Sequence, residues 1–325
     1  MTTLLADSRL CTLSVTAALT RRRFLIAGSG AVALGLAGCG QDSTSSSPAA
    51  EVGTRNVTTP LGTYDLPTEP SRVFAVDSRV DLETALALGF DVVATTLRDP
   101  APWVPAPEGI EVLDGPVVLE QVITLNPDLI ICSGEDDGQY WPTRKLMDVA
   151  PVLPTAFASP WKDDLNKVAD WAGRRGVVDE LLAEYGDLVA DARSKYGSLL
   201  DTKKVVYLQY LPATNTFAVN TAGRLQPQVL ADLGGTLFGD LRAYATDQEV
   251  SIEQIGQYAD ADGIFLQNLT PDPTLASMAD LPLWRELPAV RAGRVVESRG
   301  NINYGGIYSA QELVRNWSDL YATMI

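Results

Sequence analysis

The sequence predicts an α/β protein of two lobes with mainly parallel sheets, joined by one long α-helix. Short apolar runs alternate with helical patterns, and buried parallel strands read as such continuous runs. A stretch from residue 161 to 211 contains none of the twenty prolines of the chain, which indicates long uninterrupted helix. An internal repeat places one common pattern in each half of the chain.

Apolar runs mark the expected strands of both lobes. In the first lobe, strands are expected at 73–76, 92–94 and 129–132, with a helix over 81–88. In the second lobe, strands are expected at 205–208, 264–266 and 295–296. The predicted boundaries are 54–160 for the first lobe, 161–200 for a connecting helical segment and 201–325 for the second lobe.

The connecting segment has an amphipathic helical pattern. Its apolar positions recur at helical spacing: Val178, Leu181, Leu182, Tyr185, Leu188, Val189 and Ala192. Gly173 and Gly176 are expected to mark a break before this helix. A stiff helical connector restricts the relative movement of two lobes more than a flexible crossover does.

The repeat pairs a Glu-Gln dipeptide with a buried strand. Glu120 and Gln121 precede the strand expected at 129–132, and Glu253 and Gln254 precede the strand expected at 264–266. The lobes are therefore interpreted as pseudo-copies, each with a helix that begins near the dipeptide and leads into a strand.

Composition excludes several function classes. The chain has no histidine, so Ser-His-Asp and Cys-His hydrolases are excluded, and zinc or manganese sites are disfavoured. The 25 Lys and Arg residues against 41 Asp and Glu give a net charge of −16, and no basic cluster suited to nucleic acid is present. We expect no catalytic residue, no metal site and no cofactor.

The first 53 residues are interpreted as an export address and a tether. Arg21, Arg22 and Arg23 form a twin-arginine pattern before an apolar stretch, 24–37, that is too short to span a bilayer. The residues Leu36 to Cys39 resemble the lipobox of bacterial lipoproteins, which implies acylation of Cys39 with a palmitate-type lipid. Residues 1–38 are thus predicted to be the signal peptide and 39–53 the lipidated cysteine with a flexible linker.

The predicted location is the outer face of the cytoplasmic membrane, reached by the twin-arginine route and held by the lipid anchor alone. After removal of the signal and acylation of Cys39, Cys132 is left without a thiol partner. It is interpreted as a small buried apolar residue.

Five segments in order resemble the binding components of iron-siderophore, haem and cobalamin ABC importers: 70–76, 119–132, 250–255, 281–295 and 304–310. The resemblance implies a monomer with no catalytic activity that captures a ferric siderophore for a permease dimer and its ATPase. The last two segments are most similar to hydroxamate-siderophore binders, which implies that Tyr304 faces the ligand. Those proteins place a ligand-pairing arginine shortly before the first-lobe glutamate, where this chain has Asp114.

The iron in a ferric siderophore is already coordinated, so its receptor needs aromatic surface and cationic donors on loops that follow strands. This criterion selects nine candidate ligand-binding residues: Arg79, Arg98, Trp103, Tyr140, Trp141, Tyr210, Arg224, Tyr244 and Tyr304. Each has a structural alternative, because the arginines could be solvated charges and the aromatic rings could be packing anchors.

Glu120 and Glu253 occupy equivalent places in the repeat. In the resembled family, one glutamate per lobe docks onto arginines of the permease, and these two residues are assigned that role. The alternative is that each is favoured only by the macrodipole in the first turn of a helix.

Other functions remain open on the sequence. A haem or corrinoid receptor of the same family is one, and a non-transport sensor lipoprotein is another. A membrane-tethered enzyme would have to use carboxylates such as Glu135 and Asp136, but an exposed, solvated loop is the expected state of residues 135–137.

Overall fold

The computed structural model describes residues 53–156, 159–219, 224–239, 248–268, 274–302 and 304–325. The predicted signal peptide, Cys39 and the linker as far as residue 52 lie outside these ranges, as does Tyr244. All the described residues belong to one compact unit. None of their helices has both the length and the apolarity that crossing a membrane requires.

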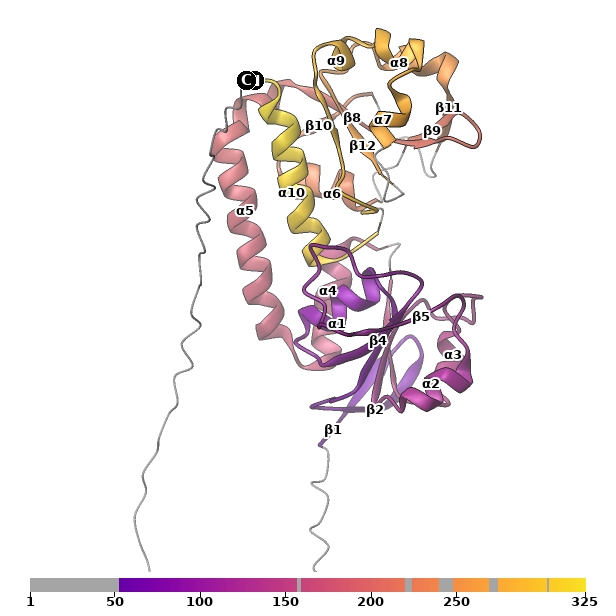
Figure 1. The fold of residues 1–325 in the computed structure, drawn as a ribbon. Helices are drawn as coiled ribbons and strands as arrows, with labels where there is room; N and C mark the ends of the chain where they lie inside the picture. The colour runs from indigo at the N-terminus through magenta and orange to yellow at the C-terminus, as the bar shows by residue number, and fades with distance from the viewer. Residues whose placement is uncertain (1–52, 157–158, 220–223, 240–247, 269–273, 303) are drawn as a thin grey trace, which may run out of the picture. The chain divides into compact units, whose positions relative to one another are not determined.

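The first lobe is built on a five-stranded parallel sheet with the order β5-β4-β3-β6-β7 (Figure 1). Its strands are β3 (Val73–Asp77), β4 (Val92–Thr96), β5 (Glu111–Leu113), β6 (Leu129–Ser133) and β7 (Val152–Thr155). The three strands expected from apolar runs are β3, β4 and β6, and they are confirmed. Because β3 has β4 on one side and β6 on the other, the chain changes direction across the sheet here, where ligands of α/β proteins commonly bind.

Helices and a hairpin complete this lobe. Its helices are α1 (Val80–Ala87), α2 (Leu119–Leu125) and α3 (Thr143–Leu146), and an antiparallel hairpin is formed by β1 (Thr54–Thr59) and β2 (Gly62–Pro67). Cys132 is a buried free thiol inside the core, as expected for a thiol left without a partner. Burial raises the pKa of this thiol well above its ordinary value, so the residue is a packing group.

The connecting segment consists of two helices. The first, α4 (Trp161–Ala172), ends at Gly173, whose φ of +70° lies in the left-handed region that glycine adopts without strain. The second, α5 (Arg175–Thr202), has 28 residues and includes Gly176, so the break expected in this region falls at Gly173 alone. The C-terminal helix α10 (Ile307–Ala322) packs along α5 (Figure 1).

The second lobe contains a six-stranded mixed sheet. Its central path has the order β11-β9-β8-β12-β13, and β10 pairs with β8. The strands are β8 (Lys204–Leu211), β9 (Thr216–Val219), β10 (Thr236–Leu237), β11 (Gln248–Ser251), β12 (Gly263–Gln267) and β13 (Val295–Glu297). The predicted strands β8, β12 and β13 are confirmed and run parallel, whereas β9 and β11 add antiparallel pairs.

Short helices cover the second sheet. They are α6 (Leu225–Asp232), α7 (Thr274–Met278), α8 (Pro282–Glu286) and α9 (Pro288–Arg291), together with the 3₁₀ helix η2 (Ile252–Tyr258). Buried aromatic rings stabilise this core, among them Phe217 and Trp284, whose centroids lie 6.0 Å apart. The predicted repeat places Glu120 on α2 and Glu253 on η2, so the two copies differ in helix type.

Candidate functional site

Arg79 is fixed at the carboxyl end of β3 by an ion pair with Asp77. Its Nε and Nη2 donate hydrogen bonds to the two carboxylate oxygens at 3.1 and 2.7 Å, and the Arg79 backbone N–H donates to the same carboxylate at 2.6 Å. The side chains are only 16% and 3% exposed. Burial alone would lower the pKa of Arg79. The hydrogen bonds to Asp77 and the negative charge of Asp77 outweigh this effect and raise the pKa above its ordinary value, so the guanidinium stays charged.

Tyr304 lies between two arginines that come from different lobes. The guanidinium carbon of Arg79 is 5.1 Å from the centroid of the Tyr304 ring, and that of Arg224, at the start of α6, is 4.6 Å from it. Both distances are within the range of cation–π attraction. The structure therefore brings together three of the predicted ligand-binding residues.

A cavity of about 560 Å³ opens beside Arg79. The loops after β3, β4 and β13 line it, and its main side chains are those of Arg79, Arg98, Trp103 and Arg299. A second hollow of about 210 Å³ is lined by Asp77, Arg79, Val80, Trp141 and Tyr304. Arg79 lines both, so the two hollows form one candidate site.

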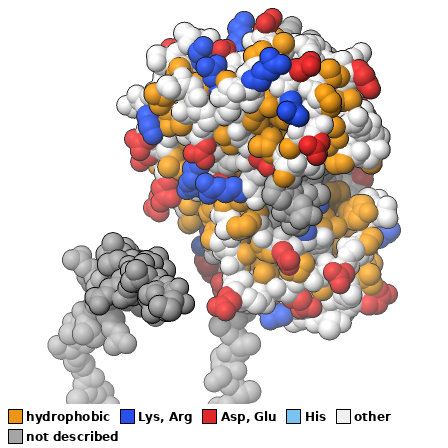
Figure 2. Space-filling view, turned by 45° about the horizontal axis from the view of Figure 1, so that its top comes forward, with side chains coloured by type: hydrophobic (Ala, Val, Ile, Leu, Met, Phe, Trp, Pro, Cys, Tyr) orange, Lys and Arg blue, Asp and Glu red, His pale blue; other side chains and the backbone are white. Residues whose placement is uncertain are grey.

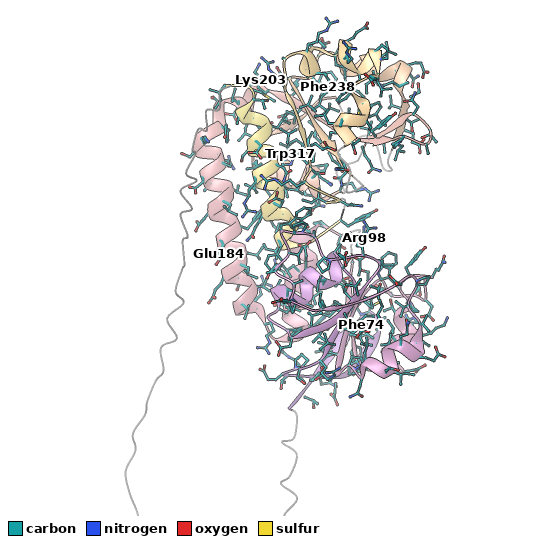
Figure 3. The ribbon with its side chains drawn as sticks, viewed as in Figure 1. Phe74, Arg98, Glu184, Lys203, Phe238 and Trp317 are labelled. Atoms are coloured by element: carbon teal, nitrogen blue, oxygen red, sulfur yellow. The ribbon has the colours of Figure 1, made fainter. Side chains whose placement is uncertain are left out.

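Arg98 adds a second positive charge to the larger cavity. Figure 3 shows this side chain on the part of the first lobe that faces the second. Burial and the nearby charge of Arg79 lower the pKa of Arg98, so the two guanidiniums repel each other within the site. An anionic or oxygen-rich ligand would relieve that repulsion.

Arg299 is a site residue that the sequence interpretation did not select. It follows β13 and makes long ion pairs with Glu312 at 3.7 Å and Asp319 at 3.9 Å, while its side chain is 67% exposed. The rule that selected Arg79 and Arg98, a cation on the loop after a strand, also applies to Arg299. The signal was present in the sequence.

Trp103 contributes the aromatic wall of the larger cavity and is fixed by a hydrogen bond to the second lobe. Its Nε1 donates to Oγ of Ser309 on α10 at 2.9 Å. A Cβ added at Gly300 would lie 3.5 Å from the indole ring, so the ring also packs close to the loop that carries Arg299.

A buried carboxylate underlies the first-lobe side of the site. Asp81 accepts hydrogen bonds from the Ser133 and Thr155 hydroxyls at 2.7 and 2.5 Å and from the Asp77 N–H at 3.0 Å. Burial, followed by the charge of Asp77, raises the pKa of Asp81 to about 7, although these hydrogen bonds oppose the rise. Asp81 ties the carboxyl ends of β3, β6 and β7 together below the Asp77–Arg79 pair.

Two of the predicted ligand-binding residues, Tyr140 and Tyr210, are not among the residues that line the two hollows. Tyr140 is 40% exposed, and its ring meets that of Trp141 edge-on, with centroids 6.0 Å apart. Tyr210 is 8% exposed, packs against Phe217 and donates its hydroxyl hydrogen to Asn215 at 2.9 Å. The position of Tyr210 favours the alternative of a core aromatic.

The acidic candidates are on the surface. Glu120 and Glu253 are both exposed, as the docking assignment requires. Residues 135–137 are exposed as well, and Asp137 accepts a hydrogen bond from the Lys145 N–H at 3.0 Å. Over the described residues, no group of three or more Cys, Asp and Glu side chains is arranged to hold a metal ion. On the face shown in Figure 2, acidic and basic side chains are interspersed.

The chain matches a known family over most of the described region. The sequence profile described as periplasmic binding protein matches residues 101–301. The iron(3+)-hydroxamate-binding protein YxeB of Bacillus subtilis is 25% identical, over 80% of this chain and 82% of that protein. The probable siderophore-binding lipoprotein YfiY of the same organism is 26% identical, over 84% of this chain and 89% of that protein.

Solved structures share the fold. The siderophore-binding protein FhuD of Vibrio cholerae, determined with bound Fe³⁺–Desferal, superposes with a TM-score of 0.62 at 19% identity. The match covers 78% of this chain and 99% of the Vibrio chain. At this level of identity the likeness establishes the architecture of two α/β lobes and a long helix, which confirms the predicted fold class.

Proposed function

The chain belongs to the periplasmic binding protein family, and from this premise we propose that it binds a ferric siderophore and delivers it to the permease of an ABC importer. The observation that carries the proposal is the cavity that Arg79, Arg98 and Arg299 line together with Trp103. The names of the two Bacillus relatives support the same ligand class.

The chemistry of the cavity suits a pre-formed iron complex. A siderophore supplies the oxygen ligands of its iron, so the receptor has to recognise the outer surface of the complex. Guanidinium groups donate charge-assisted hydrogen bonds to ligand oxygens, and aromatic rings cover its apolar parts. The volume of about 560 Å³ lies in the usual range of small-molecule sites.

We infer that the protein acts only as a receptor, with no bond-making or bond-breaking step. The buried carboxylates Asp81 and Glu83 have pKa values raised to about 7, a feature that active-site groups also show. However, each carboxylate accepts hydrogen bonds from hydroxyls and backbone N–H groups of the chain. Neither Asp81 nor Glu83 lines the two hollows.

The test is ligand-induced quenching of intrinsic fluorescence in residues 54–325. The panel contains ferric hydroxamate, ferric catecholate and ferric citrate complexes, haemin and cobalamin. Saturable quenching by one ferric siderophore class supports the proposal. A response to haemin or cobalamin alone would replace it with the haem or corrinoid receptor, and silence across the panel would favour a sensor lipoprotein.

We further propose that Cys39 anchors the protein to the outer face of the cytoplasmic membrane after export by the twin-arginine route. Cys39→Ser should move the protein from the membrane fraction to the soluble extracytoplasmic fraction. Cys132→Ala is the matched control and should stay in the membrane fraction, because that thiol is buried in the fold. Retention of Cys39→Ser in the membrane would contradict the anchor.

A further inference from the structure

Glu83 reaches from α1 of the first lobe to the start of α10. It is 1% exposed, and one carboxylate oxygen accepts hydrogen bonds from the N–H groups of Gly306 and Ser309 at 2.9 and 2.8 Å. Its other oxygen accepts a hydrogen bond from the Ser309 hydroxyl at 2.5 Å. Glu83 therefore satisfies N–H groups at the N-terminal end of α10, although it lies far from them in the sequence.

The two glycines after Tyr304 make this approach possible. A Cβ at Gly305 would lie 2.3 Å from Ser309 Oγ and 2.8 Å from Glu83 Oε1, and one at Gly306 would lie 3.2 Å from the Glu83 Cβ. The Tyr-Gly-Gly segment thus packs directly on Glu83. The position of the Tyr304 backbone depends on that contact.

The Ser309 hydroxyl extends the same network to Trp103. This hydroxyl donates to Glu83 and accepts the hydrogen bond of the Trp103 indole N–H. Glu83 is thereby linked to Trp103 through one side chain and to Tyr304 through two backbone residues. It does not line either hollow itself.

We infer that Glu83 is a positioning residue of the ligand site, holding Trp103 and Tyr304 in the geometry that binds ligand. The test of this inference by ligand affinity rests on the proposed function. The test by Trp103 fluorescence without ligand does not. The competing explanation is that Glu83 only caps α10. A pure cap would change stability and leave the two aromatic side chains as they are.

The first experiment follows Trp103 in the protein without ligand. The chain has six tryptophans, so the emission of Trp103 is obtained by subtracting the spectrum of the matching Trp103→Phe protein. Glu83→Ala and Ser309→Ala should both change this difference emission, because the indole loses its hydrogen-bonded partner or the group that fixes that partner. Ser318→Ala, a serine substitution farther along α10, is the control and should not.

The second experiment measures affinity for the ferric complex of desferrioxamine, and for the other ferric complexes of the panel. Glu83→Ala should weaken binding about tenfold, since residues that share one hydrogen-bond network are energetically coupled. Glu83→Gln should retain most of the affinity, because its amide oxygen can still accept from Gly306 and Ser309 while its NH₂ group donates to the serine hydroxyl.

A double-mutant cycle separates positioning from capping. In a Trp103→Phe, Tyr304→Ala background, the affinity loss caused by Glu83→Ala should shrink to about twofold or less, because the groups that Glu83 positions are gone. The same tenfold loss in both backgrounds would overturn the inference. So would a lowered melting temperature with affinity and Trp103 emission unchanged.

The outcomes remain distinguishable when a variant or a ligand fails. If Glu83→Ala does not fold, Ser309→Ala carries the test of the Trp103 link. If no ferric complex binds the wild-type protein, the proposed function fails, while the Trp103 difference emission still decides whether Glu83 positions that side chain. An emission unchanged in both Ser309→Ala and Glu83→Ala would then overturn the positioning role.

Discussion

Tyr304 is the candidate-site residue whose ring contacts cations from both lobes. Its ring contacts the guanidinium of Arg79 from the first lobe and that of Arg224 from the second. Since each cation–π contact is worth about 0.5–2 kcal/mol, the ring also helps to hold two like charges close together. The aromatic face is therefore expected to matter more than the hydroxyl.

Tyr304→Ala should weaken ferric-siderophore binding about tenfold, whereas Tyr304→Phe should lose less, because the phenyl ring keeps both guanidinium contacts. The measurement is a fluorescence titration of both variants beside the wild type. Thermal melts provide the control, since a half-buried residue at a loop should leave the cores intact. Wild-type affinity in Tyr304→Ala would remove this residue from the site.

Two buried carboxylates, Asp81 and Glu83, make the stability of the fold depend on pH. Burial raises the pKa of both groups to about 7, from ordinary values of 3.8 and 4.5. Between about pH 4 and 7 the folded protein keeps protons that the unfolded chain releases. Their contribution to stability is thus fully present below about pH 4 and is lost as the pH rises to about 7.

Asp81→Asn should remove the Asp81 share of this dependence. The amide can stay buried, because the Ser133 and Thr155 hydroxyls can accept from its NH₂ group while its oxygen accepts from the backbone. Unfolding midpoints in urea at pH 5 and pH 7.5 provide the measurement. Relative to the wild type, the variant should gain stability at the higher pH. Asp148→Asn, at an exposed position, is the control. An unchanged pH profile of stability in Asp81→Asn would show that Asp81 does not cause the pH dependence.

Some site residues could be selected from the sequence because their position directly after a predicted strand identifies them. Arg79 and Arg98 follow apolar runs, and cations after parallel strands meet at one edge of a sheet. Glu83 could not be found this way, because an acidic residue in the first turn of a helix ordinarily points to solvent and is favoured there by the macrodipole. Its burial depends on α10, from the other end of the chain.

At the scale of elements, the apolar runs of β3, β6, β8 and β12 were strong signals because these strands are buried on both faces. The hairpin strand β1 was not predicted, since its threonine-rich sequence is mostly exposed and contains no apolar run. The antiparallel strands β9 and β11 were missed for a related reason. They are short, and their pairing is set by contacts across the sheet.

The long helix α5 contains three glycines, and the two in its interior, Gly186 and Gly197, lower its stability. Beyond the adjacent residues and the local helix backbone, no atom lies within 4 Å of a Cβ built at Gly186 or Gly197, and both are in the helix interior. Replacing an interior glycine with alanine stabilises a helix by about 0.5–1 kcal/mol, because fewer backbone conformations are lost on folding.

Gly186→Ala with Gly197→Ala should therefore raise the melting temperature by about 2–4 °C and leave ligand affinity unchanged. Gly173→Ala is the matched contrast at the end of α4. Its φ is +70°, and its new Cβ would lie 1.8 Å from an Arg55 guanidinium nitrogen, so this variant should melt lower than the wild type. Calorimetry measures the melting temperatures. A lower melting temperature in the double variant would contradict the prediction that α5 accommodates a methyl group at both positions.

At the scale of the whole molecule, each lobe presents one exposed glutamate on a corresponding helix. Glu120 lies in the first turn of α2, and Glu253 lies in the first turn of η2. The Ser251 hydroxyl donates to Glu253 at 2.6 Å and lowers the pKa of that carboxyl, which favours a charged group at neutral pH. Two negative points, one per lobe, would suit two positive points on a dimeric permease.

Glu120→Ala with Glu253→Ala should leave the affinity for the ferric siderophore unchanged and reduce its uptake by cells, because neither glutamate is among the residues that line the hollows. Glu111→Ala with Glu180→Ala is the control, as it removes two exposed glutamates at places that the repeat does not relate. Uptake of labelled iron and fluorescence titration would be measured on the same three proteins: wild type, the control and the docking variant. An empty-vector strain gives the background uptake. A docking variant that loses affinity and uptake equally would show that these residues act through the site. Normal uptake in that variant would leave the macrodipole as the reason for a glutamate at both positions.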